Sequence, residues 1–177
     1  MDEFGFKQQA GENQRSIWFR AGGIYNTTHY SYYDKTGTSN SNYGFYVANT
    51  VQLTQPQKGA PSGLYLDTKA DYAPDDRNAY TGDVQVTLFD IGLFPGRPRD
   101  MTSLGYTRSF ISHKFRDYVG EANLSAPKSI NALSLSHAFR LTRGIYWING
   151  VTWQDNPNLV PKHESAVLWQ STMYLNF

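Results

Sequence analysis

The sequence contains no cysteine, and this absence removes two classes of structure. Disulfide bonds cannot hold the fold together, and zinc sites built on thiolates cannot form. Ser136 and His137 are neighbours in a predicted strand, so their side chains point to opposite faces and cannot act as a hydrolase pair. The four histidines also lack a metal-binding spacing. We therefore expect no catalytic residue, no metal and no other cofactor.

Long apolar runs and clusters of like charge are missing too. No segment approaches the roughly 20 continuous apolar residues of a membrane helix. The first residues, MDEFGFKQQAGENQ, are polar and contain no apolar core, so they do not resemble a signal peptide. If the protein is exported, we expect the signal to be missing or the chain to begin partway through a longer gene product. The net charge is only +1 and Lys/Arg runs are absent, which argues against a nucleic-acid partner.

Aromatic side chains are abundant in a chain that is polar on average. Tyr, Phe and Trp make up 15% of the residues, whereas the mean hydropathy is −0.55. This combination is typical of a wall with one wet face and one apolar face.

The chain is punctuated by clusters of Gly, Pro, Asn, Asp and Ser, and the segments between them alternate apolar and polar residues. Such alternation predicts β-strands, and helical periodicity is nearly absent. We expect residues 1–15 to be a polar lead-in and residues 16–177 to form a single all-β segment of about eight strands. The predicted strands are 16–27, 43–53, 63–72, 80–91, 102–111, 130–141, 144–154 and 165–177.

The segment 63–72 shows the clearest separation of faces. Asp67, Lys69 and Asp71 fall on one side, and the opposite side carries no charge. The segments 102–111 and 144–154 are ambiguous, because Arg108 and Asn149 fall on the side that is otherwise apolar.

This alternation fits a membrane β-barrel or a soluble β-sandwich. Three features favour the barrel: the segments are near the ~9–11 residues of a tilted membrane strand, the apolar faces end in aromatic residues, and the polar faces are rich in small side chains. If the chain ends on the periplasmic side, the external connections are 29–42, the region of Asn78, 113–129 and 155–164. The alternatives are a soluble all-β carbohydrate-binding domain and a small structural outer-membrane barrel.

Several stretches resemble the carbohydrate-selective porin family of Gram-negative outer membranes. They are GFYVANTVQL (44–53), GLYLDTKADYAPDDRNAY (63–80), GLFPGRPRDMTSLGYTRSFIS (92–112) and INGVTWQDNPN (148–158). The most specific parts are the Ala-Pro-Asp-Asp-Arg-Asn run at 73–78 and the Pro-Gly-Arg-Pro-x-Asp run at 95–100. The final aromatic residue is shared by outer-membrane barrels generally.

The resemblance implies an antiparallel transmembrane β-barrel of sixteen strands, of which this chain supplies about the C-terminal half. It implies a location in the bacterial outer membrane, passive diffusion of mono- or oligosaccharides, and contact with membrane lipid and the barrel assembly machinery. Half of a large barrel leaves two unpaired edges, which are costly in lipid. Alternatively, the eight strands close as a small barrel with a filled interior.

Sugar passage requires aromatic surfaces and polar groups that bind hydroxyls weakly. The predicted pore-lining, substrate-binding residues are Trp18, Arg20, Tyr65, Asp67, Lys69, Asp71, Asp83, Gln85 and Arg140. For each of them the alternative role is to solvate the channel wall. The predicted lipid-facing assembly signal of the last strand consists of Trp169, Met173, Leu175 and Phe177.

Overall fold

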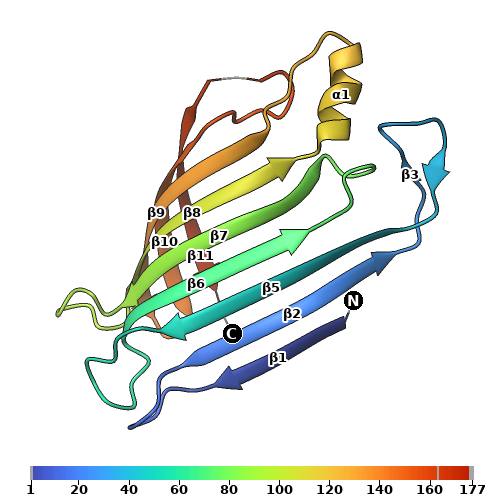
Figure 1. Cartoon of the computed structure of the whole chain (residues 1–177). Helices are drawn as coiled ribbons and strands as arrows, with labels where there is room; N and C mark the ends of the chain where they lie inside the picture. Colours follow the sequence, from blue (N-terminus) through green and yellow to red (C-terminus); the bar gives the residue numbers. More distant parts are fainter. Residues whose placement is uncertain (1, 163, 176–177) are drawn as a thin grey trace.

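The computed structural model describes residues 2–162 and 164–175 as one curved antiparallel sheet (Figure 1). Its nine strands follow the order β1-β2-β5-β6-β7-β8-β9-β10-β11, and β3 pairs only with β4 in a separate ribbon. The strands are β1 Asp2–Gln8, β2 Ile17–Asn26, β3 Tyr30–Ser31, β4 Thr38–Ser39, β5 Asn42–Gln52, β6 Gly63–Tyr72, β7 Tyr80–Ile91, β8 Met101–Ile111, β9 Ser129–Thr142, β10 Ile145–Gln154 and β11 Ala166–Leu175. A helix, α1, spans His113–Glu121.

The eight predicted strands agree with β2 and β5–β11 to within one residue at every described end. Three elements differ from the sequence prediction. Part of the expected lead-in forms β1, the expected loop 113–129 contains α1, and the expected loop 29–42 contains the β3-β4 ribbon. Within the described ranges, no helix has the length and apolar character needed to cross a membrane.

β1 forms because its side chains continue the alternation of the sheet. Phe4 and Phe6 lie on the same face as Phe19 of β2, and Glu3, Gly5 and Lys7 lie on the opposite face. All seven residues of β1 pair with β2. With only two apolar residues among charged ones, the segment was too polar to be predicted as a strand.

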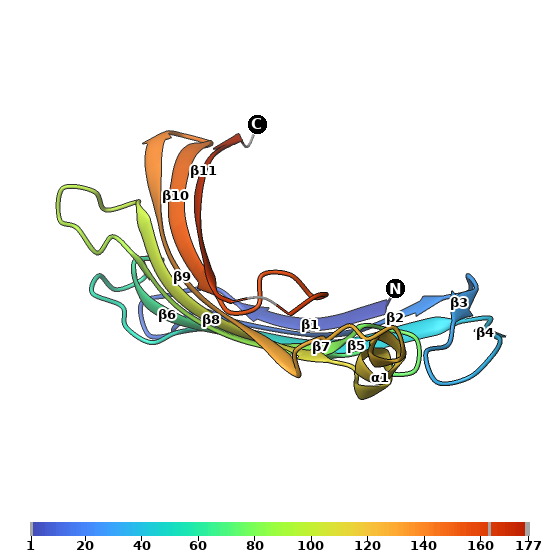
Figure 2. The same ribbon diagram turned by 90° about the horizontal axis from the view of Figure 1, so that it is seen from above.

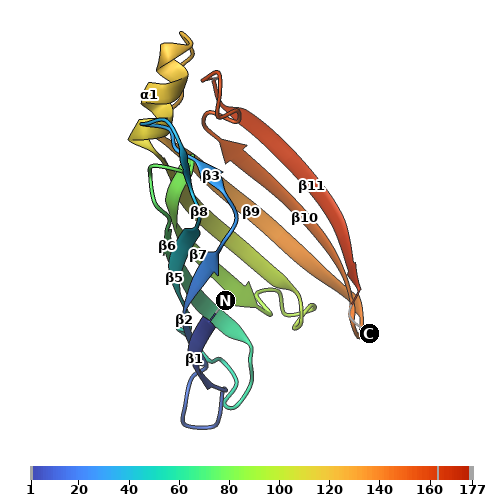
Figure 3. The same ribbon diagram turned by 90° about the vertical axis from the view of Figure 1, so that its right-hand side faces the viewer.

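The sheet is curved but open. Figure 2 shows β9, β10 and β11 turning away from the flatter part formed by β1–β7, and Figure 3 shows β10 and β11 opposite β1 and β2 across the concave side. β1 and β11 are the two edges, each paired with one neighbour only. The described chain therefore does not close into a small barrel.

The register aligns apolar side chains on one face, here called the outer face. One row crosses seven strands through Val51, Leu66, Leu88, Leu104, Leu135, Val151 and Trp169. Leu135 is 51% exposed and Trp169 is 77% exposed. Side chains spread apart on the convex side of a curved sheet and crowd together on the concave side, so the exposed apolar set marks the convex face.

The described residues form a single layer with almost no core of its own. Fully buried apolar side chains are few, and none of the described elements covers the outer face. A soluble sandwich needs a second sheet over such a face. The described residues supply no such second sheet, so the outer face has the character of a surface that contacts lipid, which favours the membrane barrel over the soluble alternative.

The connections fall at two ends of the sheet. The loop end carries the connections 27–41, 73–79, 112–128 and 155–165, with the β3-β4 ribbon and α1 among them (Figure 1). The turn end carries the connections 9–16, 53–62, 92–100 and 143–144.

Candidate functional site: the inner face of the sheet

The inner face carries polar side chains in register with one another. One row passes through Lys7, Trp18, Thr50, Asp67 and Thr87. The next row toward the loop end passes through Gly5, Arg20, Ala48, Lys69 and Gln85. Pairing therefore places predicted site residues from β2, β6 and β7 on one continuous surface.

Trp18 lies close to two cations. The Arg20 guanidinium carbon lies 3.9 Å from the centre of the Trp18 ring, and the Lys7 ammonium lies 4.7 Å from it. Arg20 Nε is buried and has no hydrogen-bond partner among the described residues. Lys7 is a member of this site that the sequence analysis did not find, because it lies in the segment expected to be a lead-in. The alternation of Phe4 and Phe6 with polar residues is the sequence feature that indicates a strand here and places Lys7 on the inner face.

The carboxylates of the inner face are partly paired. Lys69 Nζ lies 2.8 Å from Asp71 Oδ2, and the backbone N–H of Asp83 donates to Asp71 Oδ1 at 2.8 Å. The Thr50 hydroxyl donates to Asp67. Small Thr50 and Ala48 side chains of β5 lie between β2 and β6, so Trp18 and Asp67 are separated by two strand spacings, about 10 Å.

We call this surface the charged patch. It consists of Lys7, Trp18, Arg20, Asp67, Lys69, Asp71, Asp83 and Gln85. Across β8, β9 and β10 the inner face is different, with Ser103, Ser136 and Thr152 among its side chains and an Oγ to Oγ distance of 2.7 Å between the two serines. One part of the wall is thus rich in charge, and the other offers small hydroxyl groups.

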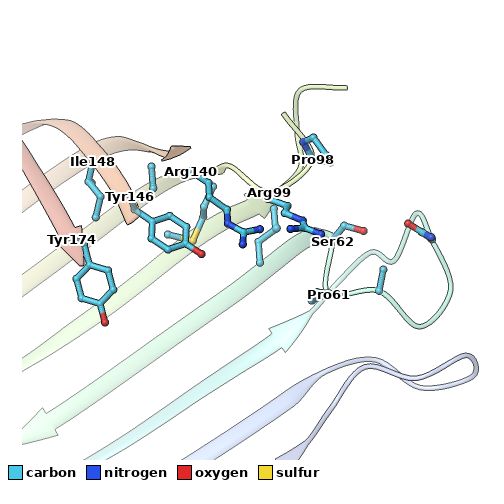
Figure 4. A pocket seen from close by; sticks show the side chains of 13 residues that line it. Pro61, Ser62, Pro98, Arg99, Arg140, Tyr146, Ile148 and Tyr174 are labelled. Carbon is cyan, nitrogen blue, oxygen red and sulfur yellow. The ribbon is translucent and has the colours of Figure 1, made fainter. Parts of the chain in front are cut away.

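Two predicted site residues lie away from the charged patch. Tyr65 is only 5% exposed, because its ring stacks on Phe89 at 4.8 Å and its hydroxyl donates to the Pro61 carbonyl at 2.7 Å. It therefore packs the turn end and offers no ring face to a solute, which corrects the expectation for this residue. Arg140 also lies at the turn end, where it lines a separate pocket (Figure 4).

The run 73–78 joins two connections of the loop end. Arg77 donates to Ser39 Oγ and to the Ser41 carbonyl, and its Nε lies 2.7 Å from Asp76 Oδ1. Asn78 and Asn42 exchange hydrogen bonds through their amides, at 2.7 and 3.0 Å. The hydrogen bond from Arg77 lowers the pKa of Asp76, so this pair stays charged at neutral pH.

Replacing Arg77 by Ala should release the β3-β4 ribbon while leaving the sheet intact. The loss of its charged hydrogen bonds corresponds to about 1–3 kcal/mol of local stability. Trypsin cleavage at Lys35, in the connection between β3 and β4, should accelerate about tenfold for each 1.4 kcal/mol lost. An Arg116→Ala variant, which removes a cation from α1, is the control. Equal cleavage rates in wild type and the Arg77 variant would contradict this role.

The run 95–100 fixes the turn between β7 and β8 against β9. Asp100 is 4% exposed and accepts hydrogen bonds from Arg97 Nε at 2.6 Å and from the Arg140 backbone N–H at 2.9 Å. Its Oδ2 lies 3.3 Å from His137 Nε2. Burial alone would raise the pKa of Asp100, but the hydrogen bonds together lower it.

The polar residues that made two predicted strands ambiguous lie on the outer face. Arg108 and Asn149 both lie on it, in register with Val84 and His137 respectively. Arg108 occurs close to the loop end, beside Asn131, which donates to Asp155 through its backbone and side chain at 2.6 Å. Arg108 therefore lies at the border of the apolar band, whereas Asn149 lies within the band, between Trp147 and Val151 of β10.

The predicted assembly signal lies on the edge strand. Trp169 and Met173 of β11 pair with Val151 and Trp147 on the outer face, and Leu175 lies on the same face. Phe177 lies outside the described residues. The role of these residues in assembly stays a prediction.

The protein's relatives have the same architecture. The sequence model described as "Carbohydrate-selective porin, OprB family" matches residues 9–158. The high-pH structure of Pseudomonas putida OprB has a TM-score of 0.86 and 17% sequence identity to the chain, over 99% of this chain and 47% of that one. The chain thus spans about half the length of that porin. No curated protein matches the chain significantly in sequence.

At 17% identity the structural likeness shows the fold alone, whereas the family match extends over most of the sequence. A single-layer antiparallel sheet with an apolar convex face agrees with both findings. The chain belongs to the carbohydrate-selective porin, OprB, family and is a β-sheet protein of the Gram-negative outer membrane.

Proposed function

We propose that the inner face lines one side of a water-filled channel through which carbohydrates diffuse passively. The observation that carries this proposal is the charged patch, where an exposed Trp18 ring lies beside cations and carboxylates on an otherwise hydrophilic wall. An aromatic ring contacts the apolar face of a pyranose, and the surrounding polar groups exchange hydrogen bonds with its hydroxyls.

Weak and distributed binding suits such a channel, because a solute must leave as readily as it enters. Lys69 and Asp71 are paired at 2.8 Å, so part of the charge is neutralised locally. Opposite charges on one wall orient water and hydroxyl groups while giving little preference for cations or anions. Neutral, hydroxyl-rich solutes then compete well with salt.

We further propose that β1 and β11 pair with additional strands in the complete barrel. Each edge strand presents unpaired backbone groups, which cost several kcal/mol apiece in hydrocarbon. A barrel of sixteen strands that contains this chain would satisfy both edges, and the 47% coverage of the solved porin supports the presence of further strands in the complete barrel. We assign the turn end to the periplasm, since outer-membrane barrels have short periplasmic turns and longer external loops.

Replacing Trp18 by Ala should weaken the block of ion current by sugars in the complete barrel. The loss of an aromatic contact of about 1 kcal/mol lowers the apparent affinity for maltose or glucose about fivefold. The assay is planar-bilayer conductance with sugar added, and Arg20→Ala and Lys69→Ala extend it to the neighbouring charges. Trp153→Ala is the control. It removes a side chain of the same type from the outer face and should leave the block by sugars unchanged.

Absence of sugar block in the wild-type barrel would contradict the channel proposal. Block that is equal in the wild type and in the Trp18, Arg20 and Lys69 variants would keep the channel but reject the charged patch as its contact surface.

A further inference from the structure

A second concave region lies on the inner face, at the turn end. It is a pocket of about 800 Å³, lined by the ends of β7–β11 and by the connections 53–62 and 92–100 (Figure 4). This volume falls within the ~300–1,000 Å³ of typical small-molecule sites. The charged patch contributes no residue to the pocket, so the two regions are distinct.

The pocket has two guanidinium groups and no acidic side chain. Arg99 comes from the connection before β8 and Arg140 from the end of β9, and Figure 4 shows both directed into the same space. Of the described residues that line the pocket, none is Asp or Glu. Arg140 Nε is buried and has no hydrogen-bond partner within the described part of the chain. Two like charges with an unused donor make a site that favours an anion.

The nearest carboxylate does not neutralise these cations. Asp100 is engaged by the Arg97 side chain at 2.6 Å and by the backbone of Arg140, not by its guanidinium. An adjoining depression is lined by four arginines, and Asp100 is the one carboxylate among its described lining residues; the arginines are Arg97, Arg99, Arg140 and Arg143. The local field therefore attracts negative charge.

The pocket wall next to Arg140 is aromatic and apolar, because Tyr146 pairs with Arg140 and Tyr174 pairs with Tyr146 on the same face. The rings of Tyr146 and Tyr174 lie 6.4 Å apart, and Ile148 and Met101 continue the same surface. A ligand that contacts both the arginines and the neighbouring tyrosines has a carboxylate for the former and a ring with an apolar face for the latter. Sugar acids of the uronic type combine these two features.

We propose that this pocket is a binding site for the carboxylate of acidic monosaccharides at the periplasmic end of the channel. The inference rests on the proposed sugar channel and deepens it, since it adds a substrate class that the charged patch does not select. A neutral sugar would pass the pocket with little retention, whereas a uronate would be held by two charged hydrogen-bonding groups.

The test measures block of single-channel current in the complete barrel with solutes added on the side of the turn end. Glucuronate should block the wild type at lower concentration than glucose does. In the Arg99→Gln/Arg140→Gln double variant, the apparent affinity for glucuronate should fall about tenfold or more, because charged hydrogen bonds are lost. Block by glucose should not change.

Arg143→Gln is the matched control, since it removes the same charge at the same end without lining the pocket. It should leave block by glucuronate within about twofold of the wild type. Acetate, at equal concentration, tests whether charge alone suffices, and it should block far less than glucuronate.

Three results would overturn the inference: no preference for glucuronate over glucose, an equal loss of affinity in the Arg143 variant, or block by acetate as strong as block by glucuronate. If neither glucose nor glucuronate blocks the wild type, the channel proposal itself fails. Glucose block without a glucuronate preference rejects only the acidic-sugar site.

Discussion

Replacing Leu135 by Arg should destabilise the complete barrel in the membrane by about 2–4 kcal/mol. Leu135 lies at the middle of β9 on the outer face, in the row that runs from Val51 to Trp169. An arginine facing lipid near the bilayer midplane costs about 2–4 kcal/mol in a β-barrel. The free energy of unfolding in lipid vesicles, measured by denaturant titration, should fall by this amount, and the folded form should accumulate less in the outer membrane.

The neighbouring residue provides the control. Ser134 precedes Leu135 in β9 but lies on the inner face, in register with Gly105 and Thr152. An arginine at position 134 remains in water, so Ser134→Arg should cost well under about 1 kcal/mol. Equal losses at the two positions would mean that both faces of β9 are in the same environment, contrary to the assignment of outer and inner face.

Replacing Asp100 by Ala should destabilise the turn end by about 2–3 kcal/mol. The change leaves the Arg97 guanidinium and the Arg140 backbone N–H without the carboxylate they share, at a position that is 4% exposed. Arg97 is 46% exposed and remains partly hydrated, so the loss stays below that of a fully buried pair. Denaturant titration of the complete barrel measures it.

Two further variants make this result interpretable. Asp117→Ala removes a carboxylate from an exposed position of α1 and should change stability by no more than about 0.5 kcal/mol. Replacing both Arg97 and Asp100 should lower the free energy of unfolding by less than the sum of the two single replacements, because both single changes break the same Arg97–Asp100 ion pair. Additive losses, or a negligible effect of Asp100→Ala, would contradict the account of the 95–100 run.

Alternation alone predicted most of the sheet, since each strand has its own apolar and polar face. The segment 63–72 illustrates why: Leu66 has a lipid-facing position and Asp67 an inner one, and this difference is visible without knowledge of neighbouring strands. Arg108 and Asn149 could not be placed in the same way. Whether such a polar residue lies at the edge or in the middle of the apolar band depends on its distance from the strand end, and this distance is known only from the register with β7 and β9.

The composition of the site depended on long-range pairing that the sequence does not reveal. Lys7 reaches Trp18 only because β1 pairs with β2, and β1 has too few apolar residues to be recognised by itself. Tyr65 has the alternation of a pore-lining residue, yet stacking on Phe89 and a hydrogen bond to Pro61 bury it. Arg140 lies on the inner face of β9, as Ser134 does, but it lines the pocket at the turn end and is not part of the charged patch.

We propose that alternate residues of each strand face channel water and lipid, and that the water side is open to sugars. Because the chain has no cysteine, single cysteines can be introduced at Leu133, Ser134, Leu135 and Ser136 of β9 and read individually. In the complete barrel in lipid vesicles, a water-soluble thiosulfonate should modify the cysteines at 134 and 136 about a hundredfold faster than those at 133 and 135, because thiolates form in water and not in hydrocarbon. Added maltose should slow modification at 134 and 136 only. Equal reactivity along the strand, a reversed pattern, or no protection by maltose would contradict the account.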